Sequence, residues 1–387
     1  MGQDITWVGI DDDKKHLTVA VLRGTSAGDT PVSRIPNEDG ALRRWVRRLE
    51  RESSGGEIRM CYEAGPNGFA LMRRLEGMGR VVVEVVAPSL TPRRTGRRVK
   101  TDPIDATHLA HLYRAGELRV IAVPDGDSES SRDLVRTYHR VGVEQTRKRH
   151  HILKFLVQRG RIYRDGVHWT GKHRKWLREQ KFESWKDTMA FEEMQSGLSE
   201  LEDRRSRLTL GLEKLGQEES RAAAVSVLRC FRGIDTTQAV TLVTELFDVD
   251  RFEHPRALMS YLGLTPSVSQ SADREVRGRI TKSGNRYARW TLGQVAKQSR
   301  YAPGVGPRVK RRREGQPAWA IEIANRAQRR LHRRYHALLV RGMPRAKVTT
   351  AVARELVAFV WEALSTVHRK SRENLSTRAG EPGLAEV

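Results

Sequence analysis

The sequence predicts a mixed α/β domain at the N-terminus, followed by a mostly helical remainder. Residues 1–125 contain short apolar segments rich in β-branched residues, and amphipathic helical patterns separate them. From Gly126 onward, long stretches with helical spacing of apolar residues replace these segments. At 387 residues the chain is too long for one ordinary domain, so two or three are expected.

The composition indicates a polyanionic partner. The chain carries 71 Lys and Arg against 47 Asp and Glu, a net charge of +24, which is more than solubility requires and points to nucleic acid. The 2 cysteines, Cys61 and Cys230, are too far apart in sequence to indicate a zinc motif or a disulfide framework. The N-terminus does not resemble a signal peptide and no segment approaches about 20 apolar residues, so we expect a cytoplasmic, nucleoid-associated protein without a membrane span.

The N-terminal elements are predicted in the order β-β-β-α-β-α-β-α, with a weak third strand. The expected strands are residues 5–10, 17–22, 32–35, 57–63 and 81–86, and the expected helices are 41–51, 69–78 and one that starts at 101–105.

Two long helices, residues 130–160 and 191–215, are predicted to form an antiparallel hairpin or coiled coil. A plain pair with a solvated charged face and a nucleic-acid-binding arm are both open, and the bases Arg147, Lys148 and Arg149 favour the arm. Further on, residues 228–239 resemble a helix-hairpin-helix turn, a phosphate-binding element, with Asp235 where a second glycine is usual. The predicted domains are residues 1–125, 126–225 and 226–364, with a disordered polar tail at 365–387.

Four carboxylates are candidates for a metal site. Asp11 and Glu63 each fall at the end of a predicted strand, and Asp102 and Asp105 share the first turn of a helix. Taken alone, the helix pair is either a cap, with Thr101 or Asp102 at the N-cap, or half of a divalent-metal site. In a ribonuclease-H-like fold, carboxylates from the first strand, the fourth strand and a late helix converge, and the order Asp, Glu, Asp, Asp fits that layout. Such oxygen ligands suit Mg²⁺.

A second candidate region is a predicted polar loop that contains Ser267, Ser269 and Ser271. Nothing in its composition selects one serine as a nucleophile, and no histidine base lies nearby in sequence. The surrounding cations make it either a phosphate-binding site or a DNA-contact loop, and they include Arg277, Arg279, Lys282 and Arg286.

Five motifs taken together resemble one family, the DEDD transposases of bacterial insertion sequences, which are serine recombinases guided by a bridge RNA. The motifs are Gly9-Ile10-Asp11 with Lys14, Tyr62-Glu63-Ala64, Lys100-Thr101-Asp102-Pro103-Ile104-Asp105-Ala106, Gly263-Leu264-Thr265-Pro266-Ser267, and Gly278-Arg279-Ile280-Thr281-Lys282-Ser283-Gly284-Asn285-Arg286. The resemblance extends from about Val8 to Leu364 in the same order.

This resemblance implies a RuvC-like domain, a coiled-coil segment and a C-terminal transposase domain. It implies Mg²⁺ held by Asp11, Glu63, Asp102 and Asp105, and a serine nucleophile, matched to Ser271, that links transiently to DNA in a composite site. The implied partners are donor and target DNA duplexes, a guide RNA and further copies of the chain, as a dimer or tetramer. The sequence departs from the family at Asp12 and Asp13, which are usually uncharged positions, and at Ala272, where glycine commonly follows the serine. The second departure leaves Ser269 as the alternative nucleophile.

Two other functions remain open. The first is a RuvC-like nuclease or junction resolvase that hydrolyses DNA with water, in which Ser271 is structural. The second is a non-catalytic, nucleic-acid-binding relic of a transposon.

Overall fold

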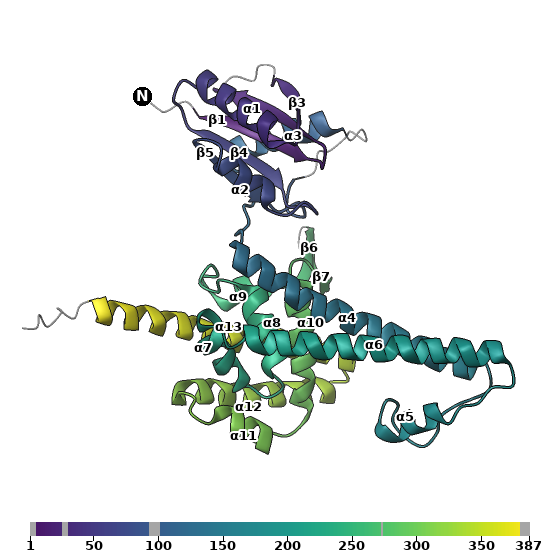
Figure 1. Ribbon diagram of the computed structural model, residues 1–387. Helices are drawn as coiled ribbons and strands as arrows, with labels where there is room; N and C mark the ends of the chain where they lie inside the picture. Colours follow the sequence, from purple (N-terminus) through teal and green to yellow (C-terminus); the bar gives the residue numbers. More distant parts are fainter. Residues whose placement is uncertain (1–4, 25–29, 93–100, 272–273, 380–387) are drawn as a thin grey trace, which may run out of the picture. The chain divides into compact units, whose positions relative to one another are not determined.

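The computed structural model describes residues 5–24, 30–92, 101–271 and 274–379 (Figure 1). The chain divides into two compact units, Met1–Pro124 and Asp125–Val387, and each is described by itself. Within the described ranges, no helix has both the length and the apolar character needed to cross a bilayer.

The first unit is built on a five-stranded sheet with the order β3-β2-β1-β4-β5. β1 pairs with β2, and β2 with β3, in antiparallel fashion, whereas β1–β4 and β4–β5 are parallel. The strands are β1 Thr6–Asp12, β2 His16–Arg23, β3 Val32–Pro36, β4 Ile58–Glu63 and β5 Val81–Val86. The predicted mixed α/β character is confirmed, and the weak third strand is present as β3.

Helices cover both faces of this sheet, and the alternation of side chains along β1 decides what each face contacts. Val8 and Ile10 belong to the same core as Leu42, on the face covered by α1 and α2. Trp7 packs on the opposite face beside Ala106 of α3. The helices are α1 Asp39–Glu52, α2 Ala70–Glu76 and α3 Asp102–Arg114.

Gly9 lets α3 approach the sheet closely. A Cβ atom built on Gly9 would lie 2.1 Å from the carbonyl oxygen of Ala106 and 2.5 Å from the backbone nitrogen of Ala110. Neither contact is sterically possible, so only glycine allows this packing. The absence of a side chain at Gly9 therefore sets how closely the α3 backbone can approach β1.

We predict that Gly9→Ala destabilises the first unit by about 1–3 kcal/mol, because α3 must move away from β1. The measurements are the denaturant midpoint and hydrogen exchange of the α3 amides. Gly40→Ala is the matched control, since a Cβ atom there meets only the end of the Arg44 side chain, at 3.5 Å. Equal midpoints and equal α3 protection in the two variants would contradict the proposed close packing.

In the second unit, α4 (Gly126–Val157) and α6 (Trp185–Leu215) form an antiparallel pair. Leu134 lies against Gly211 near one end of the pair, and Lys148 against Gly197 near the other. The pair extends away from the other helices of this unit, and α5 (Gly171–Arg178) lies near its far end (Figure 1). This pair is called the arm below.

The root of the arm shares one core with the C-terminal helices. Val135 of α4 and Leu212 of α6 are buried in the same cluster as Leu242 and Val357. Residues 126–225 and 226–364, predicted as separate domains, therefore pack into one unit. Its remaining helices are α7 Glu219–Arg229, α8 Thr236–Leu246, α9 Pro255–Tyr261, α10 Arg286–Ala296, the 3₁₀ helix η1 Lys297–Arg300, α11 Pro307–Arg313, α12 Ala318–Val340 and α13 Arg345–Ala379.

Two local predictions are corrected here. Helix α13 continues to Ala379, so residues 365–379 are helical rather than disordered, and Val367 extends its buried face beyond Leu364. The predicted polar loop instead forms a hairpin of β6 (Pro266–Ser271) and β7 (Arg274–Ile280), whose antiparallel ladder satisfies the backbone groups.

The turn between α7 and α8 gives Asp235 a structural role. It is the N-cap of α8, where it and Gln238 form a capping box. Capping explains an aspartate at the position where the phosphate-binding turn commonly has glycine.

Candidate active site

Asp11 and Glu63 lie side by side on neighbouring parallel strands. The register pairs Ile10 with Tyr62, so the next residue of each strand is Asp11 and Glu63. Cys61, two residues before Glu63, packs against α3, as Gly9 does two residues before Asp11. Because side chains alternate along a strand and neighbouring strands lie about 4.8 Å apart, both carboxylates stand on the α3 face at the carboxyl end of the sheet.

Helix α3 begins above the same edge. It runs opposite to β1, because Ala106 lies over Gly9 while the Arg114 guanidinium donates to the Gly24 carbonyl, at 3.3 Å, beyond the start of β1. The first turn of α3 therefore brings Asp102 and Asp105 to the carboxyl ends of β1 and β4. All four predicted carboxylates are at one edge and on one face.

The cap interpretation of Asp102 is not supported. Thr101 is the N-cap of α3, its side chain makes no capping hydrogen bond, and Asp102 is the first helical residue. The Asp102 side chain is exposed and has no partner in the described part of the chain, whereas Asp11 and Asp105 are half-buried and both interact with other groups. Negative charge in the first turn is favoured by the helix dipole.

The four carboxylates are not a closed metal cage. In the described ranges, only Asp248, Asp250 and His368 bring three ligand atoms within 4.8 Å of one another, and they lie in the second unit. In that group Asp250 also pairs with Arg372, at 2.8 Å. Mg²⁺ usually takes one or two carboxylates and completes its shell with water and substrate phosphate, so an open set of hard oxygens suits it.

Asp12 points away from these carboxylates. It follows Asp11 on β1, and its neighbours are Asn67 and Arg74, on the side of the sheet that carries α2. Burial raises the pKa of its carboxyl, and one of its oxygens is buried without a hydrogen-bond partner. The acidic departure at Asp12 therefore adds no ligand to the edge that carries Asp11.

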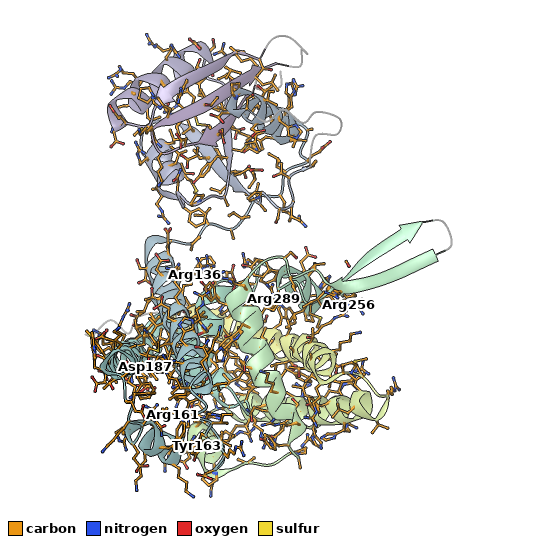
Figure 2. All side chains as sticks on the ribbon, turned by 90° about the vertical axis from the view of Figure 1, so that its right-hand side faces the viewer. Arg136, Arg161, Tyr163, Asp187, Arg256 and Arg289 are labelled. Carbon is orange, nitrogen blue, oxygen red and sulfur yellow. The ribbon has the colours of Figure 1, made fainter. Side chains whose placement is uncertain are left out.

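The serine hairpin places Ser271 at the last position of β6, opposite Arg274, and Ser269 opposite Val276. The two serines are two residues apart, so they share one face of the strand. Their side chains, and Ala272, lie outside the described residues, so the choice between the two serines stays a prediction. Figure 2 shows the hairpin projecting from the helices of its unit.

The two C-terminal motifs pack against each other at the foot of this hairpin. A Cβ atom on Gly284 would lie 1.8 Å from the Tyr261 carbonyl oxygen, and one on Gly263 would lie 2.3 Å from the Ser283 carbonyl oxygen. The Arg289 guanidinium, labelled in Figure 2, donates to the carbonyls of Leu262 and Ser283 at 2.8 and 2.9 Å. The glycines of both motifs thus serve one close backbone contact.

Asn285 is a further anchor that the sequence alone did not reveal. Its side chain caps α10 and donates to the fully buried carboxylate of Glu245, at 2.6 Å, which also pairs with Arg136 of α4 at 2.9 Å. A buried charge needs such partners. An isolated glutamate inside an apolar helix was the available sequence signal.

The predicted nucleic-acid contacts differ in how freely they are exposed. Arg279 and Lys282 are exposed and unpartnered within the described residues, whereas Arg286 donates to the Tyr287 hydroxyl at 2.7 Å. The side chain of Arg277 lies outside the described residues.

In the arm, Arg147 is exposed, and Lys148 lies against α6. Arg149 pairs with Glu202 at 3.0 Å and lies over the Trp169 ring, which gives it a structural role.

Comparison with known proteins identifies the family to which the chain belongs. A transposase model of the DEDD, IS110 type matches residues 8–159, and the model described as the transposase IS116/IS110/IS902 family matches residues 225–310. A putative transposase, y4qE, of Sinorhizobium fredii is 38% identical over 373 residues, covering 96% of this chain and 90% of that protein. The chain belongs to the IS110 family of insertion-sequence transposases.

A second relative is the transposase for insertion sequence element IS1533 of Leptospira borgpetersenii. It is 28% identical over 343 residues, which cover 86% of this chain and 96% of that protein. Membership of this transposase family implies DNA binding and DNA cleaving and rejoining activity, and the DEDD type suggests a divalent metal.

Proposed function

We propose that this transposase cleaves and rejoins DNA strands by transesterification, with Ser271 as the nucleophile and Mg²⁺ held by Asp11, Glu63, Asp102 and Asp105. The observation that supports the proposal best is the gathering of the four carboxylates at one sheet edge. The strand order and the helix on each face suit a RuvC-like assignment for residues 1–125. Residues 126–225, which include the arm, would serve as the coiled-coil segment and residues 226–364 as the transposase domain.

The donor set fits the metal. All four candidates are carboxylates, the hard oxygen ligands that Mg²⁺ prefers, and the Asp102 side chain is exposed to solvent. A bound divalent ion would supply Lewis-acid stabilisation of the phosphate charge that develops during strand exchange. The protein's own task is to hold the oxygens rigidly, which β1 and β4 achieve through their paired strand ends.

The proposed exchange conserves phosphodiester bonds. The Ser271 hydroxyl loses its proton to solvent and attacks the scissile phosphorus, so that a serine Oγ–P bond forms and the P–O bond to the leaving DNA hydroxyl breaks. The leaving oxygen takes up a proton. Attack by another DNA hydroxyl reverses these events and releases the serine, so no outside energy source is required.

A guide RNA and two DNA duplexes would be the polyanionic partners that the net charge of +24 attracts. The exposed cations of the arm and of the hairpin foot are suited to phosphate contacts. We propose that the active form is a dimer or tetramer and that it works at the nucleoid, where its DNA lies.

A trapping experiment tests the chemistry. Incubation with Mg²⁺ and a nicked DNA substrate, followed by denaturing electrophoresis, is expected to show a covalent protein–DNA adduct. Cleavage without any adduct would favour the hydrolytic nuclease, and binding without cleavage would favour the non-catalytic relic.

Sequencing of RNA that co-purifies with the protein tests guidance separately: an RNA with segments complementary to the DNA ends is expected, and its absence would contradict guidance.

Binding through the arm is expected to depend on salt. We predict that Arg147→Ala with Lys148→Ala flattens the slope of log affinity against log salt by up to about 2 units, because about one unit is lost per phosphate contact. The measurement is a salt titration of duplex DNA and RNA binding. The charge-matched control, Arg207→Ala with Lys214→Ala on α6, should leave the slope unchanged. An unchanged slope in the first variant would assign Arg147 and Lys148 to a solvated face.

Arg149 completes the predicted basic set. Neutralising it with the other two should flatten the slope by no more than the pair does, since its guanidinium already pairs with Glu202.

A further inference from the structure

A groove of about 1240 Å³ lies at the foot of the β6–β7 hairpin, in the second unit. Its walls come from α9, α12 and α13, together with Pro266 and Gly278 of the hairpin itself. Figure 2 labels Arg256, one of the lining residues, beside this foot. None of the four carboxylates belongs to this groove.

The groove carries a strong uncompensated positive charge. Its single acidic side chain, Glu355, is already paired with Arg330 at 3.0 Å and Arg334 at 2.9 Å. Five further cations line the groove and have no partner in the described part of the chain, namely Arg256, Arg279, Lys282, Lys347 and Arg354. Like charges gathered around one concavity repel each other and favour a polyanion.

The floor of the groove is apolar, and this favours a single-stranded nucleic acid over a duplex. Met259, Leu264, Met343, Ala351 and Phe359 line it. A duplex presents its phosphates outward and keeps its bases stacked inside, so it would not use such a floor. A single strand places phosphates against cations while its bases lie on apolar and aromatic side chains, as in other single-strand-binding proteins.

The polar groups favour deoxyribose over ribose. A 2′-hydroxyl needs hydrogen-bond partners, and RNA-binding sites commonly provide them. The Glu355 carboxylate is occupied by two arginines, and the Thr350 hydroxyl donates to the Ala346 carbonyl at 3.0 Å. Among its side chains, the groove therefore offers few free acceptors to which a 2′-hydroxyl could donate.

We propose that this groove binds a single-stranded segment of DNA next to the serine hairpin. The proposal rests on the proposed function, in which the chain cuts DNA and must hold a strand end during exchange. Lys347 and Arg354, seven residues apart on α13, and Arg256 on α9 would contact phosphates, and Phe359 would contact a base.

Fluorescence anisotropy with a labelled oligothymidylate of about 10 nucleotides tests the proposal on the full chain. Arg256→Ala, Lys347→Ala and Arg354→Ala, combined, should weaken binding at least tenfold and flatten the salt slope by about 2 units, at roughly 0.7 unit per phosphate. All three side chains are exposed, so the fold should be unaffected. The charge-matched control is Arg308→Ala, Lys310→Ala and Arg311→Ala on exposed positions of α11, which should change binding less than twofold.

Three comparisons decide the ligand class. Phe359→Leu should weaken oligothymidylate binding about fivefold, the lower range for loss of one stacking platform, and leave duplex binding unchanged. If the control triple variant weakens binding as much as the groove triple variant, or if duplex binding falls equally, the groove is not a single-strand site. An equal fall for oligouridylate would overturn the assignment to DNA.

Failure of this inference is distinguishable from failure of the proposed catalysis. Asp11→Ala should lose strand transfer but retain oligothymidylate binding, because Asp11 lies in the other unit. A wild-type chain that recombines DNA yet binds oligothymidylate no better than the groove triple variant does would overturn the groove alone.

Discussion

Single replacement of Asp11, Glu63, Asp102 or Asp105 by alanine is expected to lower Mg²⁺-dependent strand transfer by at least about 100-fold, with the protein still folded. Loss of groups that only support a metal ligand commonly costs 10–100-fold, and loss of a ligand itself should cost more. The side chains lie at a sheet edge and on the first helical turn, where none is fully buried, so truncation opens no core cavity. Recombination assays over a Mg²⁺ titration, with circular dichroism as the folding check, measure the effect.

Asp13→Ala is the matched control for this prediction. Asp13 is an exposed carboxylate two residues after Asp11, beyond the end of β1. Its removal changes the local charge but leaves the four candidate ligands in place. It should retain activity within about twofold. Wild-type strand transfer by any two of the four alanine variants would contradict the four-carboxylate site. Binding of Mn²⁺, measured by calorimetry, gives a second readout that does not depend on turnover.

The sheet could be predicted from the sequence because its strands carry strong local signals. Residues 17–22 and 81–86 are nearly continuous β-branched or apolar segments, which identifies them as buried strands. The ends of two other predicted strands, residues 5–10 and 57–63, located Asp11 and Glu63. The pairing of the two residues as direct neighbours could not be predicted, because strand register is a long-range property of the sheet.

Elements that depend on partners elsewhere were harder to predict. The first strand of the β6–β7 hairpin is polar, so its low hydrophobicity suggested a loop. The strand forms because its backbone pairs with β7 in an antiparallel ladder. The last turns of α13 are strongly charged, and the helix persists through contacts such as Arg372 with Asp250 and the burial of Val367. The groove cations come from distant parts of the sequence, so no local pattern revealed them.

The family motifs also combine two kinds of residue that sequence alone does not separate. Gly9, Gly263 and Gly284 are required by close backbone packing, whereas Asp102 and Arg279 are exposed and have no partner in the described ranges. A family motif therefore indicates a functional site only after the residues that serve packing have been set aside.

Ser271→Ala is expected to lower recombination by more than about 1000-fold and to abolish the trapped protein–DNA adduct, since loss of a covalent nucleophile is among the most costly single changes in an enzyme. DNA and RNA binding should persist, because the β6–β7 ladder pairs Ser271 with Arg274 through backbone groups that alanine retains.

Ser269→Ala is the matched control, because Ser269 stands on the same strand face two residues earlier and the substitution also removes a serine hydroxyl. Its activity should fall less than about tenfold. Mass spectrometry of the adduct should find the nucleotide on Ser271. A nucleotide on Ser269 would move the nucleophile by two residues, and full recombination by Ser271→Ala would eliminate it.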